Sequence, residues 1–128
     1  MANLIDLLGR LLISALFLIS AFNKIFNLEG SMSWMEGFGV PGFLIFPAIA
    51  IEIILPVLVI VGYQARISAG VLSIFCFMTA FLFHFDFSDQ MQLISFLKNI
   101  GLAGGFLFIV ANGTKDWAVD REKKYVRL

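Results

Sequence analysis

The chain has 128 residues, of which 60% are hydrophobic and only 14% are charged, and its mean hydropathy is +0.95. Soluble domains carry about 25% charged residues, so this composition excludes an ordinary water-soluble globule. The nine basic and nine acidic side chains cancel, which excludes a general electrostatic attraction to nucleic acid.

Four apolar stretches follow one another along the chain, separated by polar residues or by Gly and Pro. Each is close to the roughly 20 residues that a helix needs to cross about 30 Å of hydrocarbon. None alternates apolar and polar residues as a membrane strand would. The stretches run from Leu4 to Asn23, Phe43 to Gly62, Ile67 to Phe85 and Leu93 to Ala111. The sequence therefore predicts an all-α fold, a four-helix transmembrane bundle that forms one membrane domain over residues 1–112.

The segment between the first two stretches predicts a short additional helix. Ser33-Trp34-Met35-Glu36 fits a capping box, and Gly39-Val40-Pro41-Gly42 is typical of a helix stop. Tryptophan is enriched at membrane interfaces. We therefore expect an interfacial helix in this first outward loop, with Trp34 as its anchor at the level of the headgroups.

Basic residues predict the orientation in the membrane. In a four-span layout Lys24 and Lys98 fall on one side and the other basic residues on the opposite side. The second group contains Arg10, Arg66, Lys115, Arg121, Lys123, Lys124 and Arg127. Because cytoplasmic loops carry the excess of Lys and Arg, we expect both termini in the cytoplasm. Residues 113–128 would then form a cytoplasmic C-terminal tail, solvated or bound to headgroups.

The chain has one cysteine, Cys76, and one histidine, His84. A single cysteine cannot form an internal disulfide or a Cys-x-x-Cys redox pair. One histidine cannot supply both axial ligands of a bis-histidine haem, and the two residues together cannot complete a zinc site of four protein ligands. We therefore predict no metal site in this chain alone, and the sequence assigns no catalytic residue.

Ionisable side chains inside a bilayer cost about 2.5 to 3.5 kcal/mol each on insertion scales, which makes them functional candidates. Glu52 lies near the centre of the second stretch, with Ala48 and Pro56 on its face and Pro47 about one turn earlier. Prolines free backbone carbonyls and bend a helix, which can open a small polar cavity. Two interpretations stay open: a structural glutamate that is protonated or paired with lysine, and a group that handles protons or a ligand.

Arg10 and Lys24 lie on nearly the same face of the first stretch. They cannot both reach opposite headgroup layers, so at least one is drawn into the bundle. Asp6, four residues before Arg10, predicts a local ion pair, which favours a structural role for Arg10. The stripe between the two cations contains Ser14, Phe17 and Ala21. This side of the helix is small or polar enough to contact other helices.

Five polar side chains from four helices are expected to converge on one outward-facing pocket that binds a ligand. They are Lys24, Glu52, His84, Lys98 and Asn99. One carboxylate against two lysines supplies the pairing that burial requires. The alternatives are that Lys98 extends toward the headgroups and that His84 is a hydrogen-bonded surface group. Gly101 and Gly105 indicate close helix packing, either within the bundle or in a homodimer.

Taken in chain order, these residues resemble the DoxX family of small bacterial four-span membrane proteins, in particular its YphA-type members. The resemblance covers nearly the whole chain. It is carried by Arg10, Phe17, Lys24, Met35 to Pro41, Glu52, Gly62, Arg66, His84, Lys98-Asn99, Ala103-Gly104, Phe106, Gly113 and Asp120. Departures occur at Ala21 and Ala65, where relatives often carry Gly and Thr, and at Ala118, which replaces a small polar residue.

The resemblance implies a multi-pass protein of the bacterial inner membrane. It also implies an association with redox systems, because some relatives are subunits of quinone-linked oxidoreductases and others join complexes with detoxifying partners. It brings no set of catalytic residues. We therefore expect a small subunit or accessory of a quinone-linked or redox-stress system, with quinone as the candidate ligand. The alternatives are a non-catalytic assembly or anchoring protein and, less favoured because one four-span unit has little room for alternating access, a small transporter.

Overall fold

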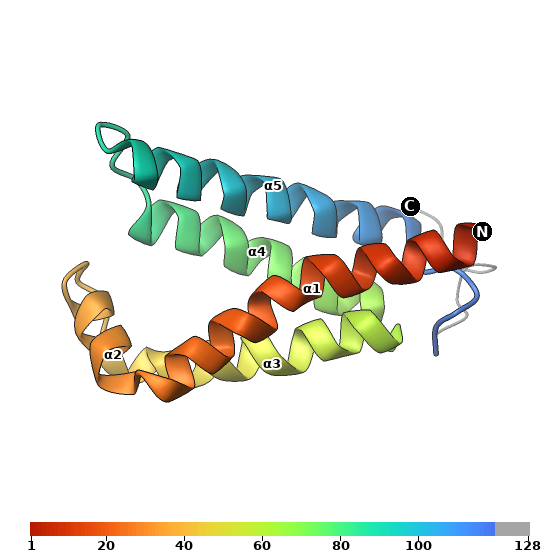
Figure 1. Ribbon diagram of the computed structural model, residues 1–128, viewed down its shortest axis with the longest axis horizontal. Helices are drawn as coiled ribbons and strands as arrows, with labels where there is room; N and C mark the ends of the chain where they lie inside the picture. Colours follow the sequence, from red (N-terminus) through yellow and green to blue (C-terminus); the bar gives the residue numbers. More distant parts are fainter. Residues whose placement is uncertain (120–128) are drawn as a thin grey trace.

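The computed structural model of the protein describes residues 1–119, and the described part is entirely helical. Figure 1 shows a bundle of long helices with one short helix folded across one end. The elements are α1 (Ala2–Phe26), α2 (Leu28–Glu36), the 3-10 turn η1 (Gly42–Leu44), α3 (Ile45–Val61), α4 (Ala65–Phe83) and α5 (Gln90–Asn112). Within residues 1–119, four helical segments are long and apolar enough to cross a membrane. The predicted all-α, four-span fold is confirmed.

The helix ends differ from the predicted stretches by a few residues. The first helix continues one turn beyond Asn23 to Phe26. The last helix begins at Gln90 rather than Leu93, because the Asp89 side chain accepts a hydrogen bond from the backbone N–H of Met91 at 3.0 Å. Such a cap satisfies one of the free N–H groups of the first turn. Hydropathy does not register it, because the capping residues are polar.

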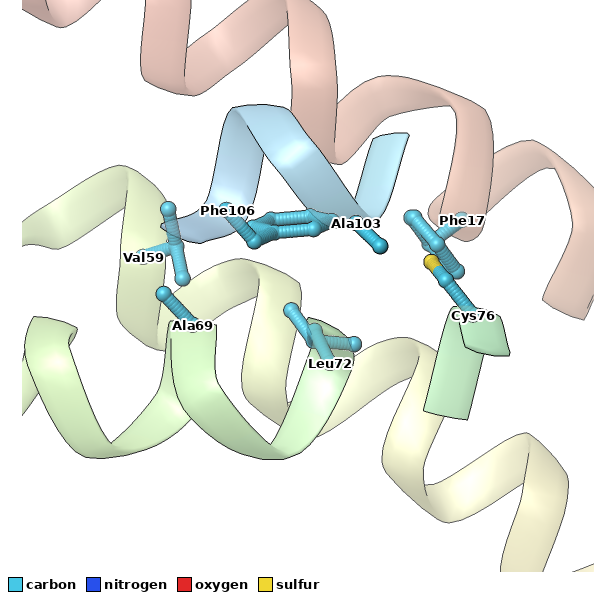
Figure 2. Packing of buried hydrophobic residues seen from close by; sticks show 7 residues of the cluster. All are labelled: Phe17, Val59, Ala69, Leu72, Cys76, Ala103 and Phe106. Atoms are coloured by element: carbon cyan, nitrogen blue, oxygen red, sulfur yellow. The ribbon is translucent and has the colours of Figure 1, made fainter. Parts of the chain in front are cut away.

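The long helices form two packed pairs, with α1 on α3 and α4 on α5, and the α3–α4 contact joins the pairs. Figure 2 shows the main hydrophobic cluster at this junction. It contains Phe17, Val59, Ala69, Leu72, Cys76, Ala103 and Phe106. Small residues let α4 and α5 approach closely, and the Ser73 hydroxyl donates to the Ala103 carbonyl across that contact at 3.1 Å. Most large apolar side chains outside the core are exposed, as expected of a surface that meets lipid.

The short helix exists, but the predicted capping box is wrong. The helix begins at Leu28 directly after Asn27, so Ser33 and Glu36 lie in its last turns rather than at its start. Trp34 is half-exposed and stacks on Phe83 at the end of α4, with ring centroids 4.7 Å apart. Chain continuity from α1 and this aromatic contact therefore position α2, and a local capping motif does not.

The two described chain ends lie at one end of the bundle (Figure 1), which we call the inner end after its predicted orientation. This end is organised around Arg10. Its side chain is 2% exposed. The guanidinium donates to the carbonyls of Val59 and Ile60 in α3 and of Trp117 beyond α5. The predicted ion pair with Asp6 is confirmed at 3.0 Å. Arg10 thus satisfies free carbonyls of the α3 end, which have no partner within that helix.

The described start of the C-terminal tail is docked on this end and is not simply solvated. The backbone N–H of Asp116 donates to the Asn3 side chain at 3.2 Å, and that of Val119 donates to the Val61 carbonyl at 3.0 Å. Thr114 is buried. The remaining predicted tail residues, 120–128 with Asp120, Arg121, Lys123, Lys124 and Arg127, lie outside the described residues. The cytoplasmic location of this end stays a prediction.

Gly62 is the point where α3 ends against the tail. Its φ is +78°, a left-handed conformation, and a Cβ at this position would overlap Ala118. We expect Gly62→Ala to lower the free energy of unfolding by about 1–3 kcal/mol, because a side chain is strained in this conformation and displaces the tail. Denaturant unfolding in detergent measures the change. The control is Gly101→Ala, since Gly101 is helical with nothing within 4 Å of an added Cβ; it should be neutral or stabilising, and equal losses would contradict the account.

Candidate functional site

A cavity of about 820 Å³ lies between α1, α3 and α4 and beneath α2. It is at the end of the bundle opposite the described chain ends, which we call the outer end after its predicted orientation. This volume lies within the range of small-molecule sites. Most of its wall is apolar and includes the aromatic rings of Phe17, Trp34, Phe75 and Phe83. A mainly hydrophobic wall with a small number of polar groups is typical of small-molecule sites.

An ion pair between Lys24 and Glu52 lies in this wall and joins α1 to α3. The ammonium nitrogen is 3.0 Å from Oε2 and 3.1 Å from Oε1 of the carboxylate. The Glu52 side chain is 4% exposed and that of Lys24 is 26% exposed. Pairing offsets the desolvation of the two charges, so the predicted lysine-paired glutamate is present. The pair leaves the site without net charge.

Ser20 completes this group, and the sequence analysis missed it. Its hydroxyl accepts from Lys24 Nζ at 2.8 Å and donates to Glu52 Oε1 at 3.1 Å. Ser20 and Lys24 are four residues apart on α1, so they share a helix face. That spacing, together with the intramembrane lysine, is the signal that could have identified Ser20.

Lys24 retains hydrogen-bonding capacity toward the cavity. An ammonium has three N–H donors. Among the described residues, the Ser20 hydroxyl accepts a hydrogen bond from one N–H, and the Glu52 carboxylate, with both oxygens close to Nζ, accepts from a second. The third N–H has no acceptor within residues 1–119. A ligand oxygen can therefore be bound without breaking the ion pair.

His84 and Asn99 line the same cavity from the end of α4 and from α5. The Nδ1 atom of His84 is 2.9 Å from the amide oxygen of Gln92. An amide oxygen only accepts, so Nδ1 carries the proton and Nε2 is left for another partner. The Asn99 side chain makes no hydrogen bond to any residue in the described part of the chain. Both therefore present polar atoms to a ligand.

Lys98 is the one predicted site residue that does not line the cavity. It is exposed on the surface of α5. Asn99 and Leu102 line the cavity, and a helix turns about 100° per residue, which puts Lys98 on the flank of that face. Its placement agrees with the alternative in which it extends toward the headgroups. The structure thus brings Lys24, Glu52, His84 and Asn99 to one cavity, and ligand binding by them stays a prediction.

Glu52 is held in a helix interrupted by proline. Pro56 is buried within α3, four residues after Glu52. Proline has no N–H, so the Glu52 carbonyl lacks the usual i+4 hydrogen bond. Pro47 and Ala48 line the cavity on the turn before Glu52. Two prolines and an alanine therefore lie within five residues of Glu52 on either side along the helix, as expected from the sequence.

No group of three or more His, Cys, Asp or Glu side chains in residues 1–119 is placed to hold a metal ion.

Comparison with known proteins agrees with the architecture. The sequence model of the DoxX family matches residues 5–85, which is more than half of the chain. The chain belongs to the DoxX family.

Two bacterial proteins are similar to this DoxX chain over most of its length. It is 33% identical over 115 residues to the inner membrane protein YqjF of Escherichia coli K12, covering 90% of this chain and 88% of the relative. It is 26% identical over 122 residues to the inner membrane protein YphA of the same organism, covering 90% and 87%. No solved structure gives a significant match. With its four candidate spans, this DoxX protein is a multi-pass protein of the bacterial inner membrane type.

Proposed function

We propose that this DoxX protein is a quinone-binding subunit or accessory of a membrane redox system. The observation that carries the proposal is a buried, charge-neutral Lys24–Glu52 pair with one unclaimed N–H, set in an apolar cavity lined by aromatic rings. A quinone offers a flat apolar ring and carbonyl oxygens that accept hydrogen bonds but carry no charge. The apolar ring suits the apolar, aromatic wall of the cavity. Because the Lys24–Glu52 pair has no net charge, the site does not require a charged ligand.

The residues have separate roles in this proposal. The free N–H of Lys24 donates to one carbonyl oxygen of the quinone and polarises it. Reduction to the quinol takes two electrons, supplied by a redox partner protein, and two protons. The two protons come from water at the polar end of the cavity: Glu52 and His84 each take up one and pass it to one of the two oxygens, since a carboxylate and a neutral imidazole both accept and release protons within hydrogen-bonding distance. Asn99 orients the ring through its unused amide.

A tail-free dimethoxy-benzoquinone is the probe that tests this function. We expect it to bind the purified protein in detergent, and we expect Glu52→Gln to weaken binding at least about tenfold, equivalent to one lost polar interaction of about 1.4 kcal/mol. Glutamine keeps the size and the contact with Ser20, so the bundle should stay folded. Titration calorimetry measures the affinity, and thermal unfolding checks the fold.

The matched control is Lys98→Ala, which removes a charge from the same end of the bundle but outside the cavity. It should leave the affinity unchanged. Absence of binding to the unmodified protein, or equal binding by Glu52→Gln, would exclude the proposed function.

The second candidate function is a non-catalytic assembly or anchoring protein. The observation in its favour is that the Lys24–Glu52 pair and Arg10 both tie α1 to α3, which buried charges can do purely to specify packing. In that case Glu52→Gln should reduce stability and function together. Retained stability with lost quinone binding favours the first function.

A further inference from the structure

Part of the cavity wall is formed by side chains that are also exposed on the side of the bundle. The helices form the pairs α1–α3 and α4–α5, and the cavity lies where the pairs separate. Several apolar side chains both line the cavity and are exposed on the molecular surface. They are Leu16 on α1 and Val71, Ile74, Met78 and Leu82 on α4. These side chains border a lateral opening between α1 and α4.

The lateral opening extends along the hydrocarbon layer and is not confined to the headgroup level. From Val71 to Leu82 the α4 backbone rises about 16 Å at 1.5 Å per residue. This length is about half of a 30 Å hydrocarbon core. At the outer end of the cavity lie His84 and Trp34, two side chains with polar atoms. The polar end of the cavity thus corresponds to the headgroup layer of one membrane leaflet, and its apolar side corresponds to the hydrocarbon layer of that leaflet.

We propose that the cavity is loaded from the bilayer through this lateral opening, by a ligand with a long apolar chain attached to its carbonyl-bearing ring. The ring occupies the cavity beside Lys24 and Glu52, while the chain lies across Ile74 and Met78 and stays in contact with lipid. This inference rests on the proposed function. It adds the route by which the ligand enters and the apolar chain that the ligand carries.

The energetics favour this route for a chain-bearing ligand. Every CH₂ group of an apolar chain adds to the free-energy cost of moving the chain from lipid into water, so a long-chain molecule is concentrated in the membrane. A chain that remains in the opening exchanges lipid contacts for contacts with apolar side chains, at little cost. Only the ring has to leave the lipid, and the polar atoms of the cavity then bind its oxygens.

The ester carbonyls and acyl chains of a phospholipid share this chemistry, so the experiment must separate the two sources. Two probes with the same dimethoxy-benzoquinone ring are used, one without a chain and one with a decyl chain, on protein in phospholipid nanodiscs. The decyl probe should displace any bound lipid, which mass spectrometry of the protein detects. Retention of phospholipid with no binding of either probe overturns both proposals.

The opening itself is tested by Ile74→Trp, with Ile67→Trp as the matched control. Both residues lie on α4 and are strongly exposed, at 61% and 66%, but only Ile74 lines the cavity. We expect Ile74→Trp to slow association of the decyl probe at least about tenfold and to slow the chain-free probe much less, because that probe has no chain to pass through the lateral opening. Ile67→Trp should change neither. Chain-free binding that depends on Glu52, together with decyl binding that is insensitive to Ile74→Trp, overturns the lateral route alone and leaves the proposed function standing.

Discussion

Replacing Arg10 with alanine is expected to lower the free energy of unfolding by about 3–5 kcal/mol, the usual cost of removing one partner of a buried charged network. The guanidinium is almost fully buried and hydrogen-bonds to Asp6, to two carbonyls of α3 and to the Trp117 carbonyl. Its loss removes the donor of the three backbone carbonyls and leaves Asp6 with only the backbone N–H of Lys115 as a donor. Denaturant unfolding in detergent, followed by circular dichroism, measures the change.

Arg66→Ala is the matched control for Arg10. Arg66 also donates to carbonyls at a helix end, those of Val110 and Ala111 in α5, but it is only half-buried. Water can replace part of the hydrogen bonding that Arg66 provides to these carbonyls, so we expect Arg66→Ala to lower the free energy of unfolding by about 1 kcal/mol. Arg10→Lys should fall between the two, because one ammonium cannot reproduce the fork of the guanidinium. Equal losses for Arg10→Ala and Arg66→Ala would show that Arg10 does not organise the inner end.

Lys24→Met is expected to destabilise the protein by about 3 kcal/mol, the lower end of the range for breaking a buried pair. The Glu52 carboxylate is buried and would lose its counter-charge, so it must protonate or remain charged at a cost. Methionine keeps the length and apolar character of the lysine stem. Unfolding in detergent again measures the effect.

A second substitution separates the charge from the packing. Adding Glu52→Gln to Lys24→Met removes the uncompensated carboxylate, so the double variant should regain at least half of the lost stability. Such non-additivity is the signature of a direct interaction. Additive losses would mean that the two side chains contribute independently, and the ion pair would then not be a unit of the site.

Local sequence patterns identify the buried carboxylate of the candidate site but not its partner. Glu52 is identifiable from sequence because a carboxylate in the middle of an apolar stretch is rare and costly. The sequence does not show that Glu52 pairs with Lys24 rather than with Lys98, because either lysine could supply the positive charge. The rotation of α5 decides between them by presenting Asn99 to the cavity and Lys98 to the surface.

The same limit applies at the ends of the bundle. The Asp6–Arg10 pair was predictable, since it joins residues four apart on one helix. The bonds from Arg10 to Val59 and Trp117 span 49 and 107 residues of sequence, and no local pattern specifies them. The docking of the tail and the placement of α2 on Phe83 are contacts of this long-range kind.

The sequence by itself determined that this protein crosses the membrane as four helices, because a bilayer accepts a spanning chain only when each segment satisfies its own backbone hydrogen bonds and is apolar for about 20 residues. It also determined which buried charges need partners. The tertiary structure alone decided which partners they obtain and where a cavity remains. The physical reason is that lipid solvates any apolar helix face equally well, so hydropathy identifies spans and carries no information on which faces meet.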